Sequence, residues 1–292
     1  MKLYRFPDNK IWKLLFPVCL FLLLLLARDT LITTCLLGFY ASQLTVVALI
    51  MAIGIVFLVY NRKRWKEIFR DPRIILLAVS AILILLPIVF KLDLQLMYFS
   101  VLLCILFAVF LTYFVTLKEM AKVYVVIMTV LAAYSVFAVY IGRIPADLGM
   151  VSMPTFFNAG ERDFYNFGLS FVSISQVKFR NFGIFREPGV YQYFLILALL
   201  LHNYILSWDK GWKYWLINIV LVVTALTTFS TNGVVEAGLL VLVVFFDKKL
   251  YKDRKILVTA VILAVLAVIG ISVIMLRGGD LAFTLKQMVA KL

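Results

Sequence analysis

The amino-acid sequence predicts an all-α, polytopic integral membrane protein with about nine transmembrane helices. Hydrophobic residues make up 64% of its 292 residues, charged residues make up 15%, and the mean hydropathy is +1.05. In soluble domains, by contrast, apolar residues account for about half of the chain. Most apolar residues here fall in nine runs of roughly the 20 residues that a helix needs to cross the hydrocarbon core. The composition therefore excludes an ordinary soluble domain.

The nine runs give the predicted helices in order along the chain. Their approximate bounds are 11–27, 36–60, 74–90, 94–117, 123–141, 190–208, 214–229, 234–246 and 256–276. The seventh and eighth runs are short, which predicts either two tilted helices or one broken pair. The sequence shows no separate soluble domain, so residues 1–292 are predicted to form a single transmembrane domain.

The first run resembles a signal peptide, because an apolar stretch follows Lys2, Arg5, Lys10 and Lys13. A cleavable signal also needs a site with small residues, and none precedes Arg28. The first run is therefore predicted to remain as a membrane anchor.

The basic residues predict a cytoplasmic N-terminus and an extracytoplasmic C-terminus. With this orientation, 19 of the 29 Lys and Arg residues fall in inner segments, as the positive-inside rule requires. The net charge of +14 would suggest a nucleic-acid partner for a soluble protein. Since the positive charges lie mostly between the apolar runs, topology accounts for them and we expect no nucleic-acid partner.

The three cysteines predict neither a disulfide framework nor a metal site. Cys19, Cys35 and Cys104 each lie in or beside an apolar run, without CxxC spacing and without a histidine nearby.

One predicted outer loop, residues 142–189, is far longer than the other outer connections. Long loops in compact helical proteins tend to carry function. Within it, Tyr165, Phe167, Leu169 and Phe171 alternate with polar residues or glycine, a period that predicts a short strand or ribbon. An aromatic belt at the lipid headgroups is an equally good interpretation.

The loop closes with the sequence KFRNFGIFREPGVY, residues 178–191, which concentrates unusual residues at the start of the sixth run. Arg180 and Arg186 carry the guanidinium groups best suited to grip phosphate oxygens. Pro188 fits the first position of a helix, whose free N–H groups attract an anion. In the alternative interpretation, Glu187 and Pro188 merely cap the helix and the arginines bind ordinary headgroups.

Two motifs together resemble the O-antigen polymerase and O-antigen ligase family of bacterial membrane glycosyltransferases. The first is RNFGIFREPGVYQYFLILALL, and the second is TALTTFSTNGVVEAGLLVLVVFF, a turn rich in Ser and Thr between two apolar runs. Their order and spacing match the family over roughly residues 178–246, and the rest of the chain agrees in hydropathy alone.

The resemblance implies polymerisation or ligation of oligosaccharide repeat units carried on polyprenyl diphosphate, at the outer face of the bacterial cytoplasmic membrane. It implies no metal or other cofactor. Arg180 and Arg186 would bind the diphosphate, and Glu187 would be the base for the acceptor hydroxyl. Besides the lipid-linked substrate, the implied partners are membrane lipids and the flippase and chain-length regulator of the same pathway. Residues expected to support the loop and helix start are Gly183, Pro188 and Gly189.

Two further ionisable residues fall inside predicted spans. Glu236 is a departure from the family pattern; it would pair with Arg180 or Arg186, serve as a less favoured base, or snorkel from a shallow depth. His202, the sole histidine, lies about 18 Å down the sixth helix, so we expect a residue near the inner interface rather than a catalytic one.

Family members normally continue with another outer loop, so the sequence predicts a short or C-terminally truncated member. Two other classes of function compete with the polymerase. A flippase or carrier of lipid-linked saccharide would also present arginines to an anionic lipid, although neither repeats nor broken helices in both halves are evident. A non-catalytic membrane partner of a polysaccharide assembly is the other alternative.

Overall fold

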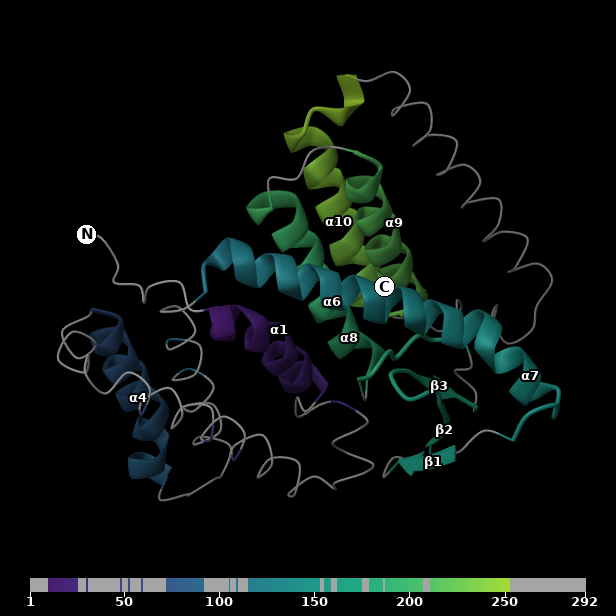
Figure 1. Cartoon of the computed structure of the whole chain (residues 1–292), viewed down its shortest axis with the longest axis horizontal. Helices are drawn as coiled ribbons and strands as arrows, with labels where there is room; N and C mark the ends of the chain where they lie inside the picture. Colours follow the sequence, from purple (N-terminus) through teal and green to yellow (C-terminus); the bar gives the residue numbers. More distant parts are fainter. Residues whose placement is uncertain are drawn as a thin grey trace. The chain divides into compact units, whose positions relative to one another are not determined.

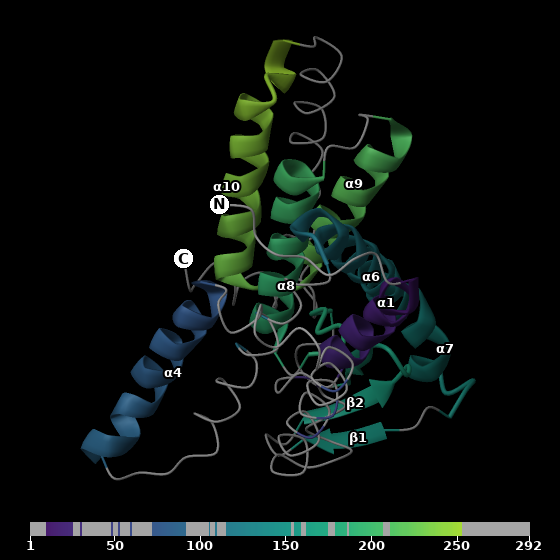
Figure 2. The ribbon, with the colours of Figure 1, turned by 60° about the vertical axis from the view of Figure 1, so that its left-hand side comes forward.

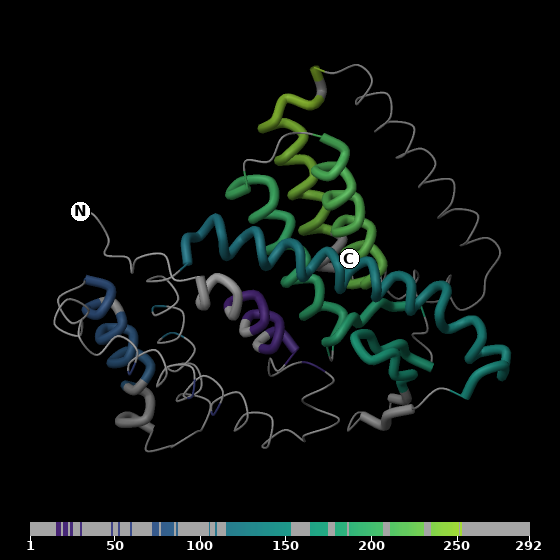
Figure 3. Tube along the Cα trace, in the orientation of Figure 1, coloured from purple at the N-terminus to yellow at the C-terminus, as the bar shows by residue number. Residues whose placement is uncertain are grey.

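The structure is a computed structural model, and its described part is mostly helical with one small sheet. It divides into two compact units, Met1–Arg28 with Ile32–Met120 and Asp29–Leu31 with Ala121–Leu292. The predicted spans 36–60, 94–117 and 256–276 lie largely outside the described residues, which are coloured in Figure 1; Figure 3 traces the same chain as a tube. The described residues are 10–25, 30, 48, 52, 59, 72–91, 105, 109, 115–152, 155–158, 162–174, 179–185, 187–206 and 211–252.

Two helices of the first unit coincide with predicted spans. Helix α1 (Lys10–Leu25) covers the first apolar run and contains Pro17, and α4 (Pro72–Lys91) covers the third. The two helices supply the bulk of what is described in this unit.

A continuous helical segment runs from residue 117, at the end of the first unit's sequence, into the sequence of the second unit. Helix α6 (Leu117–Phe137) begins with a capping box, in which Thr116 and Glu119 each accept a hydrogen bond from the other's backbone N–H. It continues through the π-helix η3 (Ala138–Gly142) into α7 (Arg143–Asp147). Over the part of the chain that is described, Leu117–Asp147 alone is long and apolar enough to cross a membrane, with 31 residues and a hydropathy of 2.2.

A three-stranded antiparallel sheet follows, in the order β1 (Thr155–Asn158), β2 (Arg162–Asn166) and β3 (Phe171–Ser173). The alternating segment Tyr165–Phe171 lies in a hairpin and is not one strand, because β2 ends at Asn166, residues 167–170 form the connection and β3 begins at Phe171. The fold is mostly helical with a small sheet, so the all-α prediction is wrong for the loop. Period two alone does not reveal a turn when the turn residues happen to continue the alternation.

The remaining helices form a bundle beside the sheet (Figures 1 and 2). Helix α8 (Pro188–Leu200) continues into the π-helix η4 (Leu201–Ile205), and α9 (Trp212–Thr227) and α10 (Thr231–Asp247) both pack against α8. A short 3-10 turn, η5 (Leu250–Lys252), follows α10.

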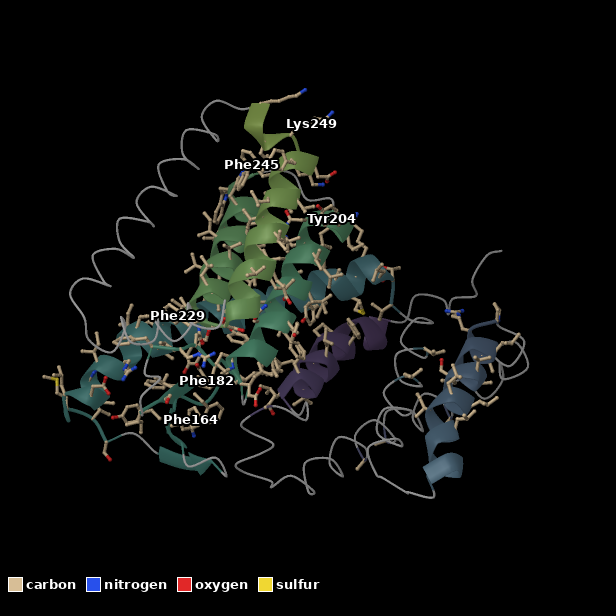
Figure 4. All side chains as sticks on the ribbon, turned by 180° about the vertical axis from the view of Figure 1, so that it is seen from behind. Phe164, Phe182, Tyr204, Phe229, Phe245 and Lys249 are labelled. Atoms are coloured by element: carbon tan, nitrogen blue, oxygen red, sulfur yellow. The ribbon has the colours of Figure 1, made fainter. Side chains whose placement is uncertain are left out.

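The seventh and eighth predicted runs are two separate helices, α9 and α10, joined by only three residues. In this turn, the hydroxyl of Thr228 donates to the carbonyl of Ala225 and accepts from the N–H of Ser230. Phe229 has a positive φ of 45°, which reverses the chain direction. The N-terminus of α8 and the α9–α10 turn therefore lie at one end of the bundle, near the labelled Phe229 and Phe182, while Tyr204 and Lys249 mark the other end (Figure 4).

Candidate functional site

The motif segment 181–185 is folded into the interior of the second unit instead of lying on its surface. The side chains of Asn181, Phe182, Ile184 and Phe185 are at most 1% exposed. The Phe182 ring packs edge-on against Phe164 of β2, with centroids 5.3 Å apart, and Phe185 stacks on Tyr191 of α8. The segment thereby links the sheet to the start of the bundle.

Asn181 is the centre of a buried hydrogen-bond network. Its amide nitrogen donates to the hydroxyls of Ser135 on α6 at 3.0 Å and Thr227 on α9 at 3.2 Å. Its backbone N–H donates to the Thr227 carbonyl at 2.9 Å, and its amide oxygen accepts from the N–H of Gly183 at 3.0 Å. The Ser135 hydroxyl also bonds the Tyr191 hydroxyl of α8 at 3.0 Å. Asn181 thus bonds α6 and α9 directly, and Ser135 extends the network to α8.

Gly183 is required by both conformation and space. Its φ is +54°, and a Cβ at this position would lie only 2.6 Å from the Tyr191 ring. The same tripeptide, Asn-Phe-Gly, occurs at Asn166–Gly168, where Asn166 accepts from the Gly168 N–H at 2.8 Å and Gly168 has a φ of +78°. Nothing lies within 4 Å of a Cβ there. The chain therefore uses one turn twice, once exposed and once buried.

Arg180 lies against the C-terminal end of α9. Its Nε donates to the carbonyl oxygen of Thr228 at 3.3 Å, where the helix dipole is negative and favours a cation. The Arg180 side chain is half-buried, which leaves part of it accessible. Arg186 falls outside the described residues, so the binding of one diphosphate by Arg180 and Arg186 together stays a prediction.

Glu187 is the N-cap residue of α8 and has an extended backbone. Pro188 follows as the first residue of the helix, as predicted. Its side chain is exposed and forms no capping hydrogen bond. The capping interpretation of Glu187 therefore holds for the backbone and not for the carboxylate.

The first turns of α8 and α10 are in close contact. A Cβ at Gly189 would lie 3.6 Å from the hydroxyl of Ser230. Farther in, Nε2 of Gln192 donates to Oε2 of the half-buried Glu236 at 2.8 Å. Among the described residues, Glu236 is thus held by Gln192 rather than by Arg180, so the expected pairing with that arginine is not found.

His202 lies away from this site. It is completely buried in η4, its ring stacks on that of Tyr214 at 4.8 Å, and its Nε2 lies 3.2 Å from the Tyr214 carbonyl oxygen. Neighbouring Asn203 bonds Asn218 of α9 at 2.8 Å. These contacts join α8 to α9 at the end opposite Arg180, so His202 has a packing role.

Sequence reasoning missed Asn181 and Gln192, the two amides that tie the site together. A signal was present for Gln192, because an amide inside the apolar run VYQYFLILALL is expected to face other helices. Asn181 carried no such signal, because it looked like an ordinary loop residue next to Arg180.

The two sequence motifs therefore meet at the sheet end of the bundle, with Arg180 and Glu187 at the surface and Gln192 and Glu236 about one turn inside. The chain matches no model of a known protein family, no curated protein and no solved structure.

Proposed function

We propose that this chain is a multi-pass protein of the bacterial cytoplasmic membrane that polymerises or ligates oligosaccharides carried on polyprenyl diphosphate. The observation that carries the proposal is the contact between its two family-like motifs. Arg180 and Asn181 bond residues of the second motif 48 and 46 positions later, and Gln192 bonds Glu236, 44 positions later. Segments that resemble one family's motifs and also build one local site are better explained by shared function than by chance likeness.

The exposed faces of the helices support a membrane location. Each of the apolar side chains on one face of α9 is between 42% and 70% exposed, and their spacing of four and three residues follows the helix period. This stripe runs for about 21 Å along the helix. Water would solvate such a stripe poorly, whereas lipid tails cover it. The residues are Trp212, Leu216, Ile219, Val223 and Leu226.

Helix α6 and its continuation carry a second exposed apolar stripe. In contrast, several polar side chains of α6, α8 and the end of α9 are buried. This distribution is the reverse of that expected in water and suits a bundle surrounded by hydrocarbon. The exposed residues are Val126, Val130, Phe137, Ile141 and Ile144, and the buried polar ones include Ser135, Gln192, Thr224 and Thr228.

The proposed reaction takes place at the sheet end of the bundle, which the positive-inside rule assigns to the outer face. Arg180 and Arg186 hold the diphosphate and stabilise its charge as it leaves the anomeric carbon. An acceptor hydroxyl forms the new bond, and a carboxylate, Glu187 or Glu236, takes its proton.

Deletion of the gene in its native host tests the function. A polymerase predicts accumulation of single, unpolymerised repeat units on the lipid carrier, with their sugar on the outer side. Accumulation on the inner leaflet would instead identify a transporter. An unchanged distribution of glycan lengths would contradict the proposed function.

A further inference from the structure

A buried polar pair about one turn inside the sheet end of the bundle has an unused hydrogen-bond acceptor. Gln192 is 1% exposed, and its Nε2 donates to Glu236. Since a carboxylate oxygen accepts, this bond fixes which end of the amide faces Glu236. The other end, Oε1 of Gln192, is buried and has no hydrogen-bond partner among the described residues. Buried acceptors without partners are uncommon and call for an explanation.

The pair lies close to the predicted anion site but deeper. Gln192 is four residues after Pro188 and Glu236 five residues after Thr231, which places them about 6 Å and 7.5 Å along their helices. Arg180 binds the turn that precedes α10, at the carbonyl of Thr228. The site therefore has two levels: an outer one with the cation Arg180, and an inner one with the hydrogen-bond acceptors of Gln192 and Glu236.

The chemistry of the inner level selects its ligand. Glu236 and Oε1 of Gln192 only accept hydrogen bonds and carry negative or partially negative charge. A diphosphate, which is itself an anionic acceptor, is repelled there and remains at the arginine level. A sugar presents neutral hydroxyl donors on adjacent carbons, and two neighbouring acceptors suit two such donors.

We propose that Gln192 and Glu236 form the subsite for hydroxyl groups of the acceptor saccharide, with Glu236 as the base. This inference rests on the proposed function. The attacking oxygen forms a bond to the anomeric carbon while the bond to the diphosphate oxygen breaks, and that electron pair leaves with the diphosphate. The hydroxyl proton passes to the Glu236 carboxylate. Nε2 of Gln192 orients this carboxylate, and Oε1 of Gln192 accepts a hydrogen bond from the neighbouring sugar hydroxyl.

The surroundings of Glu187 argue against the same role for that residue. A base must be held within hydrogen-bond reach of the proton that it removes. Glu187 is exposed at the helix start and its carboxylate makes no capping hydrogen bond, whereas Glu236 is half-buried and fixed by Gln192. The structure thus favours Glu236, which the sequence alone ranked second.

Variants of the full chain in nanodiscs test the subsite with lipid-linked repeat units extracted from the deletion strain. Glu236→Gln is expected to slow chain extension on the order of 100-fold or more, the usual effect of removing a general base. Addition of formate to Glu236→Ala should restore part of the rate, which a purely structural role would not allow. Gln192→Leu should lower kcat, because the base is no longer oriented.

Asp247→Asn is the matched control, since it removes an exposed carboxylate from the far end of the same helix. Its rate should equal that of the wild type. The size-exclusion profile shows whether Glu236→Gln folds. If it does not, Glu236→Asp is tested in its place, and its rate of chain extension should be reduced but measurable. Full activity of the folded Glu236 variant, or loss in Glu187→Gln with retention in Glu236→Gln, would overturn the inference. An inactive wild type would instead refute the proposed function.

Discussion

Asn181→Ala is expected to lower the free energy of unfolding by about 3 kcal/mol or more. The buried N–H of Gly183 loses its acceptor, which costs about 1–3 kcal/mol, and each lost bond to Ser135 and Thr227 adds about 1 kcal/mol. Helices α6 and α9 would no longer be joined by the Asn181 side chain. Denaturant titration of the purified protein, followed by tryptophan fluorescence, measures the change.

Asn166→Ala is the matched control, because it removes the same turn bond from the same tripeptide sequence. The bond from the Gly168 N–H to Asn166 is exposed, so water replaces the lost acceptor and the expected loss is below about 1 kcal/mol. Equal losses for the two variants would show that Asn181 acts only within its turn and does not connect the helices.

Replacing Arg180 and Arg186 together by alanine is expected to reduce chain extension by about 1000-fold. Each arginine is proposed to neutralise charge on the diphosphate as it leaves, and the loss of one such group typically costs 100-fold to 1000-fold, so about 1000-fold is a conservative figure. The rate is measured with lipid-linked repeat units and the full chain in nanodiscs. Because Arg180 also donates to the Thr228 carbonyl, the unfolding midpoint of the double variant is measured to confirm that it folds.

Lys213→Ala combined with Lys248→Ala serves as the control for charge. Both lysines are on the α9–α10 pair but at the end opposite Arg180, with Lys213 in the first turn of α9 and Lys248 after α10. Screening isolates them from the proposed site, so the rate should change by less than about twofold. A strain with normal glycan despite the double arginine replacement would leave a non-catalytic partner as the better explanation.

Hydropathy alone predicted where most of the described helices lie, but the span predicted at 123–141 is a longer helical segment, Leu117–Asp147, which enters the predicted loop 142–189. The spans predicted at 190–208, 214–229 and 234–246 correspond to α8 with η4, to α9 and to α10. Apolar length is a local property, so it can be read without knowledge of the fold. Phe229, whose positive φ separates α9 from α10, has no such local signal because it is not glycine.

The site could be predicted only in part, because its contacts join distant residues. Glu187 and Pro188 were recognised by type and position and lie at the predicted helix start, whereas Arg180 lies against the turn between α9 and α10. Arg180 was predicted as one possible partner of Glu236, but Glu236 is bonded by Gln192. The sequence gives no sign that the Gln192 side chain points toward α10. Likewise, the burial of segment 181–185 depends on packing against Phe164 and Tyr191, which a loop assignment does not anticipate.

Incubation of the purified full chain in nanodiscs with lipid-linked repeat units, without nucleotide sugar and with EDTA present, tests the central claim most directly. Catalysis by this chain predicts a ladder of products on a gel, spaced by one repeat unit, or a single transferred product for a ligase. Recovery of the repeat units unchanged by a folded protein would contradict the claim.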